Sequence, residues 1–231
     1  MIRALYSASS GMVAQTVKQD ITANNIANSQ TVGFKRQRVV TSTFAETLDD
    51  QYAGMTPARR PPYPGSPVAP STVSAEASLD TTAGPLEVTG NSLDFAIAGS
   101  GSFEVKSAST GTRLTRAGDF RLGPQGELLT SDGSEVQGRS GSIRLPKEGK
   151  VEVADDGTIR VNDTEVDKIK LVNDKPGETR LIQGSLEQSN VSIVGEMVEM
   201  IANMRSFEAN QRMIQSVDRT LDKLINEAGK V

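Results

Sequence analysis

Residues 193–228 read IVGEMVEMIANMRSFEANQRMIQSVDRTLDKLINEA, and this stretch decides the fold expected of the chain. One set of positions recurs at alternating steps of four and three residues: Ile193, Met197, Met200, Met204, Phe207, Gln211, Ile214, Asp218, Leu221, Ile225 and Ala228. A sustained 3.5-residue repeat is typical of a left-handed coiled coil. A single helix cannot bury such a stripe, so it needs a second helix or another subunit as its partner.

The N-terminal segment offers a partner helix. Residues 2–28 carry a stripe at three- and four-residue steps, formed by Ile2, Leu5, Met12, Val13, Val17, Ile21 and Asn24. Asn24 and Asn28 continue this face, whereas Asn25 points elsewhere. An amide in an apolar stripe lowers stability but fixes register and partner, although a frayed helix end is the simpler alternative. Gly33 then permits a turn that Phe34 anchors.

The middle of the chain follows a different period. Between residues 93 and 171, short segments such as LDFAI (93–97) and SFEVK (102–106) alternate apolar and polar residues, separated by turn residues such as Asp132-Gly133. This pattern is typical of antiparallel hairpins. Six of the ten prolines lie in residues 54–75, which indicates an extended linker.

The predicted fold is therefore α+β: long N- and C-terminal helices pair as an α-helical coiled coil, with an inserted antiparallel β-rich domain. The predicted boundaries are an N-terminal helix with its turn region (1–48), a Pro-rich linker (49–85), a β-rich domain (86–185) and a C-terminal coiled-coil helix (186–231).

The amino-acid composition excludes several kinds of functional site. The chain has 231 residues with no Cys and no His, which excludes disulfides, thiol catalysis, histidine acid–base chemistry and ordinary zinc sites. A net charge of −4 gives no attraction to nucleic acid, and neither a signal peptide nor a membrane-spanning stretch is expected. The glycine-rich turn at residues 98–101 lacks the partners of a phosphate-binding loop. We therefore expect no catalytic, cofactor-binding or metal-binding residues, and no enzyme.

Three blocks of the sequence resemble the bacterial flagellar axial proteins, and among them the basal-body rod proteins. These blocks are MIRALYSASSGMVAQ with ITANNIANSQTVGFKR, then SLDFAIAGSGSFEV with LTRAGDFRLGPQGELLTSDG, and finally GSLEQSNVSIVGEMVEMIANMRSFEANQRMIQSVDRTLDKL. The resemblance implies a self-assembling, non-enzymatic subunit of a helical axle. Its terminal helices would form an inner tube, with the β domain outside. It also implies export in the unfolded state by the flagellar type III apparatus, and Phe44 and Leu48 fit the family's export-gate motif.

The implied location is the basal-body rod, after export from the cytoplasm. The implied partners are copies of the chain, other rod and hook-side axial proteins, the export apparatus and the basal-body rings. A cofactor, nucleic acid and membrane insertion are not expected. The FlgF (proximal) and FlgG (distal) types both stay open. The predicted subunit interface comprises Leu5, Met12, Val17, Ile21, Asn24, Asn28, Ile193, Met197, Met200, Met204, Phe207, Gln211, Ile214, Leu221 and Ile225.

A competing hypothesis is a cytosolic coiled-coil adaptor that forms a closed dimer with one partner. The two hypotheses differ in the product of assembly, because head-to-tail contacts grow into an open polymer whereas symmetric contacts close.

Overall fold

The structure is a computed structural model that describes residues 2–43, 73–107, 111–146, 149–162, 164–172 and 179–228. The chain divides into two compact units. Unit 1 comprises Met1–Ala27, Gln37–Asp80 and Ser192–Val231, and unit 2 comprises Asn28–Arg36 and Thr81–Val191. The candidate export-gate residues, Phe44 and Leu48, lie outside the described residues.

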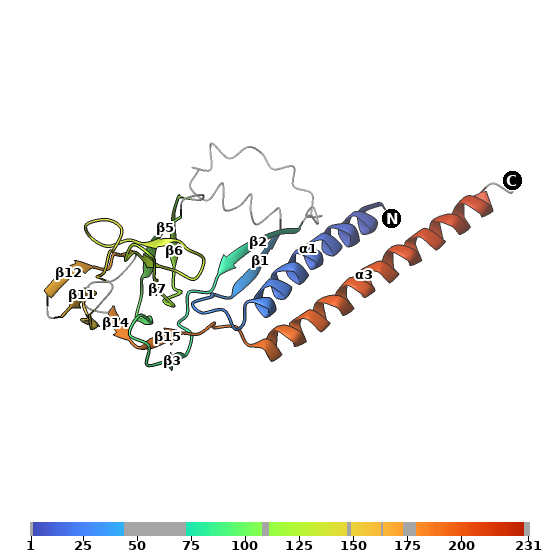
Figure 1. Ribbon diagram of the computed structural model, residues 1–231. Coiled ribbons are helices and arrows are strands. Elements are labelled where there is room, and N and C mark those ends of the chain that lie inside the picture. The colour runs from blue at the N-terminus through green and yellow to red at the C-terminus, as the bar shows by residue number, and fades with distance from the viewer. Residues whose placement is uncertain are drawn as a thin grey trace, which may run out of the picture. The chain divides into compact units, whose positions relative to one another are not determined.

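Unit 1 contains the two helices found in the described residues, α1 (Ile2–Ala27) and α3 (Ile193–Ala228), and one pair of strands. The helices run antiparallel side by side, because Gly11 of α1 lies against Asn210 of α3 while Asn25 bonds to Glu196 (Figure 1). Strand β1 (Gln37–Thr43) pairs antiparallel with β2 (Val73–Leu79), and α1 also packs against both strands.

The prediction that the terminal helices pair as a coiled coil is wrong. The described residues form two helices and many antiparallel strands in several sheets, and the contact between the helices is not an apolar heptad seam. Met197 and Met204, two predicted seam positions, are 50% and 48% exposed. Among the described side chains of α3, the two buried ones are polar: Glu196 is 2% exposed and Asn203 is 9% exposed. A coiled coil buries apolar knobs at these positions.

The covered face of α3 is turned relative to the predicted stripe. Its less exposed positions from Glu196 onwards are Glu196, Met200, Asn203, Phe207, Asn210, Ile214, Val217 and Leu221. These also follow four- and three-residue steps, but every second position falls one residue before its predicted counterpart. One residue corresponds to about 100° around the helix axis, and because only every second position shifts, the covered face is turned by about 50° relative to the predicted stripe. The apolar repeat and the covered face therefore overlap only in part.

Unit 2 is built from strands, all paired antiparallel. The largest sheet has the order β13-β5-β9-β8-β7, and β6 pairs with β5; a second sheet has the order β10-β11-β12. Two further pairs are β14-β4 and β15-β3. The strands are β3 (Leu86–Val88), β4 (Phe95–Ala98), β5 (Ser102–Ser107), β6 (Gly111–Thr115), β7 (Arg121–Leu122), β8 (Leu128–Leu129), β9 (Glu135–Val136), β10 (Val151–Val153), β11 (Thr158–Val161), β12 (Thr164–Lys168), β13 (Leu171–Val172), β14 (Arg180–Gln183) and β15 (Ser185–Glu187).

One apolar core holds unit 2 together. Within it, the Phe120 ring centroid lies 5.8 Å from that of Phe95 and 5.1 Å, edge to face, from that of Phe103. The alternation of β5 explains the burial, because Phe103 and Val105 point inward while their neighbours do not. Burying a side chain of this size contributes about 1.5–3 kcal/mol. The core thus gives unit 2 a stable scaffold for its loops.

Candidate functional site

The segment that joins α1 to β1 lies in unit 2, where it forms a tight turn around Gly33. The Phe34 N–H donates to the Thr31 carbonyl at 3.2 Å, and the Gly33 N–H donates to the Glu187 carbonyl at 2.7 Å. Gly33 has φ +67°, and an added Cβ would lie only 2.3 Å from the Ala117 nitrogen. Both the backbone conformation and the close approach therefore require glycine here.

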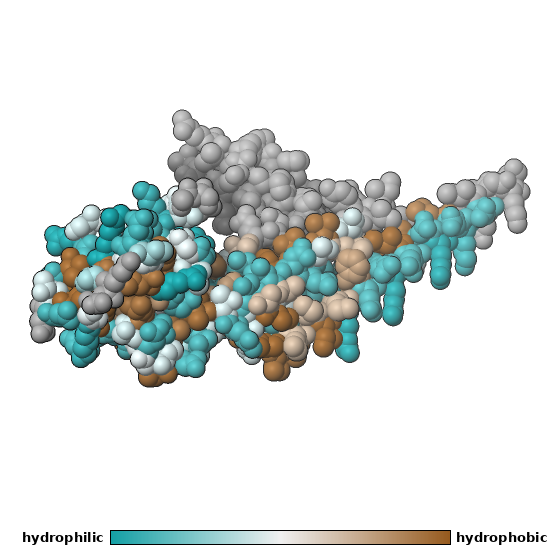
Figure 2. Space-filling view, in the orientation of Figure 1, coloured by the Kyte–Doolittle hydropathy of each residue, from teal (hydrophilic) through white to brown (hydrophobic). Residues whose placement is uncertain are grey.

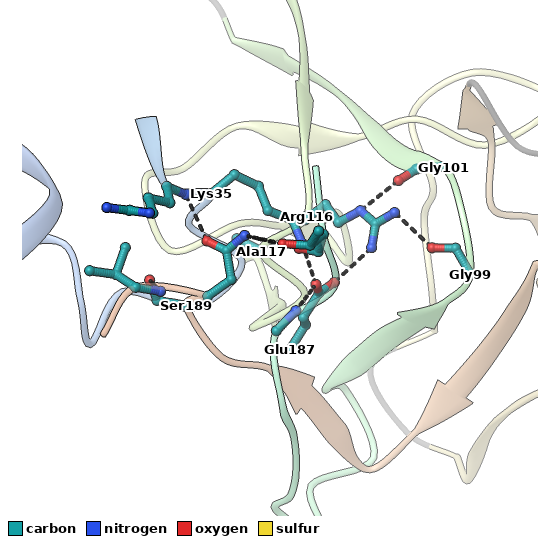
Figure 3. Close-up of polar contacts among 12 residues, drawn as sticks. Lys35, Gly99, Gly101, Arg116, Ala117, Glu187 and Ser189 are labelled. Carbon is teal, nitrogen blue, oxygen red and sulfur yellow. Dashed lines mark hydrogen bonds and ion pairs between the residues drawn. The ribbon is translucent and has the colours of Figure 1, made fainter. Parts of the chain in front are cut away.

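A buried carboxylate, Glu187 of β15, is the centre of a polar network in unit 2 (Figure 3). Its side chain is 1% exposed. The Lys35 ammonium lies 2.5 Å from Oε1, and the Arg116 guanidinium lies 3.0 Å from Oε2. Arg116 also donates to the carbonyls of Gly101 and Gly99, each at 2.8 Å. One carboxylate thus joins the turn after α1 to two loops of the β unit.

The charge of Glu187 is stabilised in spite of its burial. Desolvation acts to raise its pKa, but the Lys35 ammonium, the Gly84 N–H at 2.9 Å and the Arg116 guanidinium together hold the pKa below its ordinary value of 4.5. The carboxylate is therefore ionised at neutral pH. Removal of either cation would leave a buried charge with incomplete pairing, which is costly.

A second polar cluster lies in unit 1 and is centred on Asn25 of α1, which is 1% exposed. Its amide nitrogen donates to the Gln37 carbonyl at 2.9 Å and to the Glu196 carboxylate at 3.1 Å, and its amide oxygen accepts the Gln37 N–H at 2.9 Å. Asn25 thereby binds α1 to β1 and to α3. The stripe predicted from the sequence included Asn24, which is exposed, and left Asn25 outside.

An exposed apolar stripe runs along the N-terminal part of α3. Its five side chains are 48–73% exposed: Val194, Met197, Val198, Ile201 and Met204. Their spacing places them on one face of the helix. Figure 2 shows hydrophobic residues gathered over this part of α3. We call these five residues the α3 stripe.

The other predicted interface residues differ in exposure. Asn24 and Gln211 are exposed. The side chains of Leu5 and Ile225 lie outside the described residues. The rest are half-buried: Met12, Val17, Ile21, Asn28, Ile193, Met200, Phe207, Ile214 and Leu221. The predicted turn residues, Gly33 and Phe34, are half-buried too.

Asn25, Lys35, Arg116 and Glu187 were not predicted as site residues from the sequence. None of these four residues is among the predicted interface residues, and Glu187 lies just before the apolar repeat of α3. One feature of the sequence could have indicated Lys35, Arg116 and Glu187, because each lies inside one of the three blocks that resemble axial proteins. Their pairing was not readable, because 71 residues separate Arg116 from Glu187 and 152 separate Lys35 from Glu187.

The described residues offer little for ligand chemistry. They contain no group of three or more acidic side chains placed to hold a metal ion. A surface hollow of about 660 Å³ in unit 2 is lined by charges of both signs. Four of these charges form two ion pairs, Lys168 with Asp156 at 3.2 Å and Lys170 with Glu104 at 2.9 Å. No helix in the described part of the chain is long and apolar enough to cross a lipid bilayer.

Unit 2 is thus a β scaffold with a buried polar network, and unit 1 has a buried polar cluster and a helix with an exposed apolar face. An exposed apolar face of this kind is typical of a subunit that assembles with others. Comparison with known proteins gives the family. Three family models match: flagella basal body rod protein (residues 5–35), flagellar hook protein FlgE/F/G D1 domain (96–161) and flagellar basal body rod FlgEFG protein C-terminal (182–227). The flagellar basal-body rod protein FlgG of Bacillus subtilis is 32% identical to this chain, covering 98% of the chain and 99% of the relative.

Two relatives named FlgF match at nearly the same level. The flagellar basal-body rod protein FlgF of Salmonella typhimurium is 30% identical over 94% of the chain and 95% of its own length. That of Mesorhizobium japonicum is 30% identical over 97% of both chains. The chain belongs to the flagellar basal-body rod protein family.

Proposed function

We propose that this chain is a structural, non-enzymatic subunit of the bacterial flagellar basal-body rod. It assembles with copies of itself and with other rod and hook-side axial proteins, within the basal-body rings. The rod transmits torque from the motor to the hook. Membership in the rod protein family supports this role, and the single structural observation that carries it is the exposed α3 stripe.

The energetics of the stripe favour a partner. Its five side chains, about half exposed, would contribute roughly 4–8 kcal/mol if another subunit covered them. They extend over about 15 Å of helix. The covered face of α3 lies elsewhere, so a neighbouring subunit has access to the stripe within unit 1. A contact of this kind is heterologous when the neighbour offers a different face, and repeated heterologous contacts build a helical polymer.

Substitutions that introduce charge into the α3 stripe test whether the stripe is needed for assembly of the rod. We expect Val198→Glu combined with Ile201→Glu to leave the thermal melt of the soluble chain nearly unchanged, because both side chains are exposed, but to prevent rod formation. Gln215→Glu is the control, since it adds a charge at an exposed position of α3 outside the stripe. The measurements are electron microscopy of purified hook–basal bodies and swimming motility. Normal rods in the doubly substituted strain would refute the proposal.

We also propose that the chain leaves the cytoplasm unfolded through the flagellar type III apparatus. Support comes from the family membership and from the match of Phe44 and Leu48 to the export-gate motif. Deletion of residues 2–28 should abolish secretion and assembly, while unit 2 keeps its β fold. Secretion is measured in culture supernatants of a hook-deficient strain. Replacing Phe44 by Ala should reduce secretion, and unchanged secretion would eliminate that motif from the proposal.

A further inference from the structure

The chain passes between the two units four times, after residues 27, 36, 80 and 191. Each passage is a single stretch of backbone, and a single stretch can turn about its φ and ψ angles. The chain therefore has four connections between the units. Whether they act together depends on what holds their ends in unit 2.

Three of these ends are bonded to one another inside unit 2. The Arg36 N–H donates to the Asn190 side-chain oxygen at 2.7 Å. The Asn190 amide nitrogen donates to the Thr82 carbonyl at 3.0 Å, and the Lys35 ammonium donates to the same carbonyl at 2.7 Å. Every one of these residues lies within two positions of a passage. The bonds therefore link the passages at residues 36, 80 and 191.

Glu187 fastens this group to the remaining passage and to the β scaffold. The Gly33 N–H donates to its backbone carbonyl, in the turn that starts at the passage after residue 27. Its carboxylate accepts from Lys35, from the Gly84 N–H and from Arg116, which is itself fixed to the carbonyls of Gly99 and Gly101. Figure 3 shows Glu187 in contact with Arg116, which reaches on to Gly99 and Gly101.

We propose that Lys35, Glu187 and Asn190 form a clamp that gathers all four connections at one place on unit 2. Through this clamp, a load on unit 1 enters the β scaffold. The inference rests on the proposed role in torque transmission and assigns that role to a particular group of side chains. They are positioning residues. A buried ion pair adds little net stability compared with apolar packing, but its geometry is specific.

Amide hydrogen exchange on the soluble full-length chain tests the clamp. Glu187→Gln keeps the shape of the side chain and removes its charge. We expect the Gly33 and Gly84 amides to exchange at least tenfold faster in this variant. The Leu128 and Leu145 amides, bonded to Ile143 and Gly126 in the core, should keep their rates. Arg113→Gln is the control, because it breaks an ion pair with Asp132 whose side chains are 53% and 46% exposed.

A second variant guards against misfolding of the first. Asn190→Ala removes the bonds to Arg36 and Thr82 but leaves the buried charges paired, and it should speed exchange of the Arg36 amide at least fivefold. The proposal would be refuted if the folded variants showed smaller increases in exchange rate at the Gly33, Gly84 and Arg36 amides. It would also be refuted if the Leu128 and Leu145 amides showed an equal increase in exchange rate.

Motility separates this inference from the proposed function. In a Glu187→Gln strain, swimming speed in viscous medium should fall by more than half relative to wild type, and the Arg113→Gln strain should match wild type. Wild-type speed in the Glu187→Gln strain would overturn the mechanical role. Absence of the wild-type chain from purified basal bodies would instead refute the proposed function, and the exchange result would be unaffected.

Discussion

Replacement of Asn25 by Ala should destabilise unit 1 far more than replacement of its neighbour Asn24. Asn25→Ala removes two hydrogen bonds to the Gln37 backbone, worth about 1 kcal/mol each, and one to the Glu196 carboxylate, worth about 1.5–3 kcal/mol. The higher helix propensity of Ala returns about 0.5 kcal/mol. The expected loss in the free energy of unfolding is therefore about 3–4.5 kcal/mol. Asn24→Ala changes an exposed position, with the same gain in propensity, and should stay within about 0.5 kcal/mol of wild type.

Urea unfolding followed by circular dichroism at the helix band measures this difference, because both helices of the described chain belong to unit 1. Asn25→Asp provides a further check. It keeps the acceptor for the Gln37 N–H but places a second carboxylate against Glu196, so it should be at least as destabilising as Asn25→Ala at neutral pH. If Asn25→Ala and Asn24→Ala differ by less than about 1 kcal/mol, the reasoning that Asn25 binds α1, β1 and α3 together is refuted.

Three further predictions concern unit 2. Gly33→Ala should cost more than about 3 kcal/mol, because it combines positive φ with a backbone clash, whereas Gly133→Ala, with φ +81° in open space, should cost about 1 kcal/mol in thermal melts. Because the folded-state pKa of Glu187 lies below 4.5, its stabilising effect is complete above pH 4.5 and is lost as pH falls through that lower pKa. Urea titrations from about pH 7 to about pH 3 should therefore show a steeper loss of stability in wild type than in Glu187→Gln, and parallel curves would contradict this. Phe103→Ala should cost about 3–5 kcal/mol in the same titrations at neutral pH, and a loss below about 1 kcal/mol would argue against the aromatic core.

The β unit was the most predictable part of the chain. A period of two indicates a sheet face directly, and Phe103 and Val105 are buried on β5 as alternation requires. The predicted turn at Asp132-Gly133 is confirmed by the positive φ of Gly133, 81°. Local chemistry decides such turns, so one sequence suffices. The pairing of β1 with β2 was not predicted, because its strands are separated by the Pro-rich segment and neither alternates strongly.

The helix partner could not be predicted from the repeat. A heptad spacing gives the direction of the apolar face but does not identify what covers it. Met200, Phe207, Ile214 and Leu221 recur every seven residues, so they belong both to the predicted stripe and to the covered face. The intervening positions differ by one residue, and there the structure covers Glu196 and Asn203, whereas the repeat favoured Met197 and Met204. Apolar periodicity gives weight to methionine and none to a buried glutamate whose partner lies 171 residues away.

The contact between α1 and α3 covers polar residues where the repeat predicts apolar ones, and this explains why the helices suit an assembling subunit. If the stripe of Met197, Val198 and Ile201 paired with α1, the chain would bury its strongest apolar surface within itself. Instead the contact near the start of α3 contains the Asn25–Glu196 hydrogen bond, whose donor and acceptor must both be in place. The apolar face stays exposed and is available to a neighbour. On the proposed function, the exposed apolar residues of α3 are therefore buried in the assembled rod, whereas the buried polar residues stabilise the fold of the single chain.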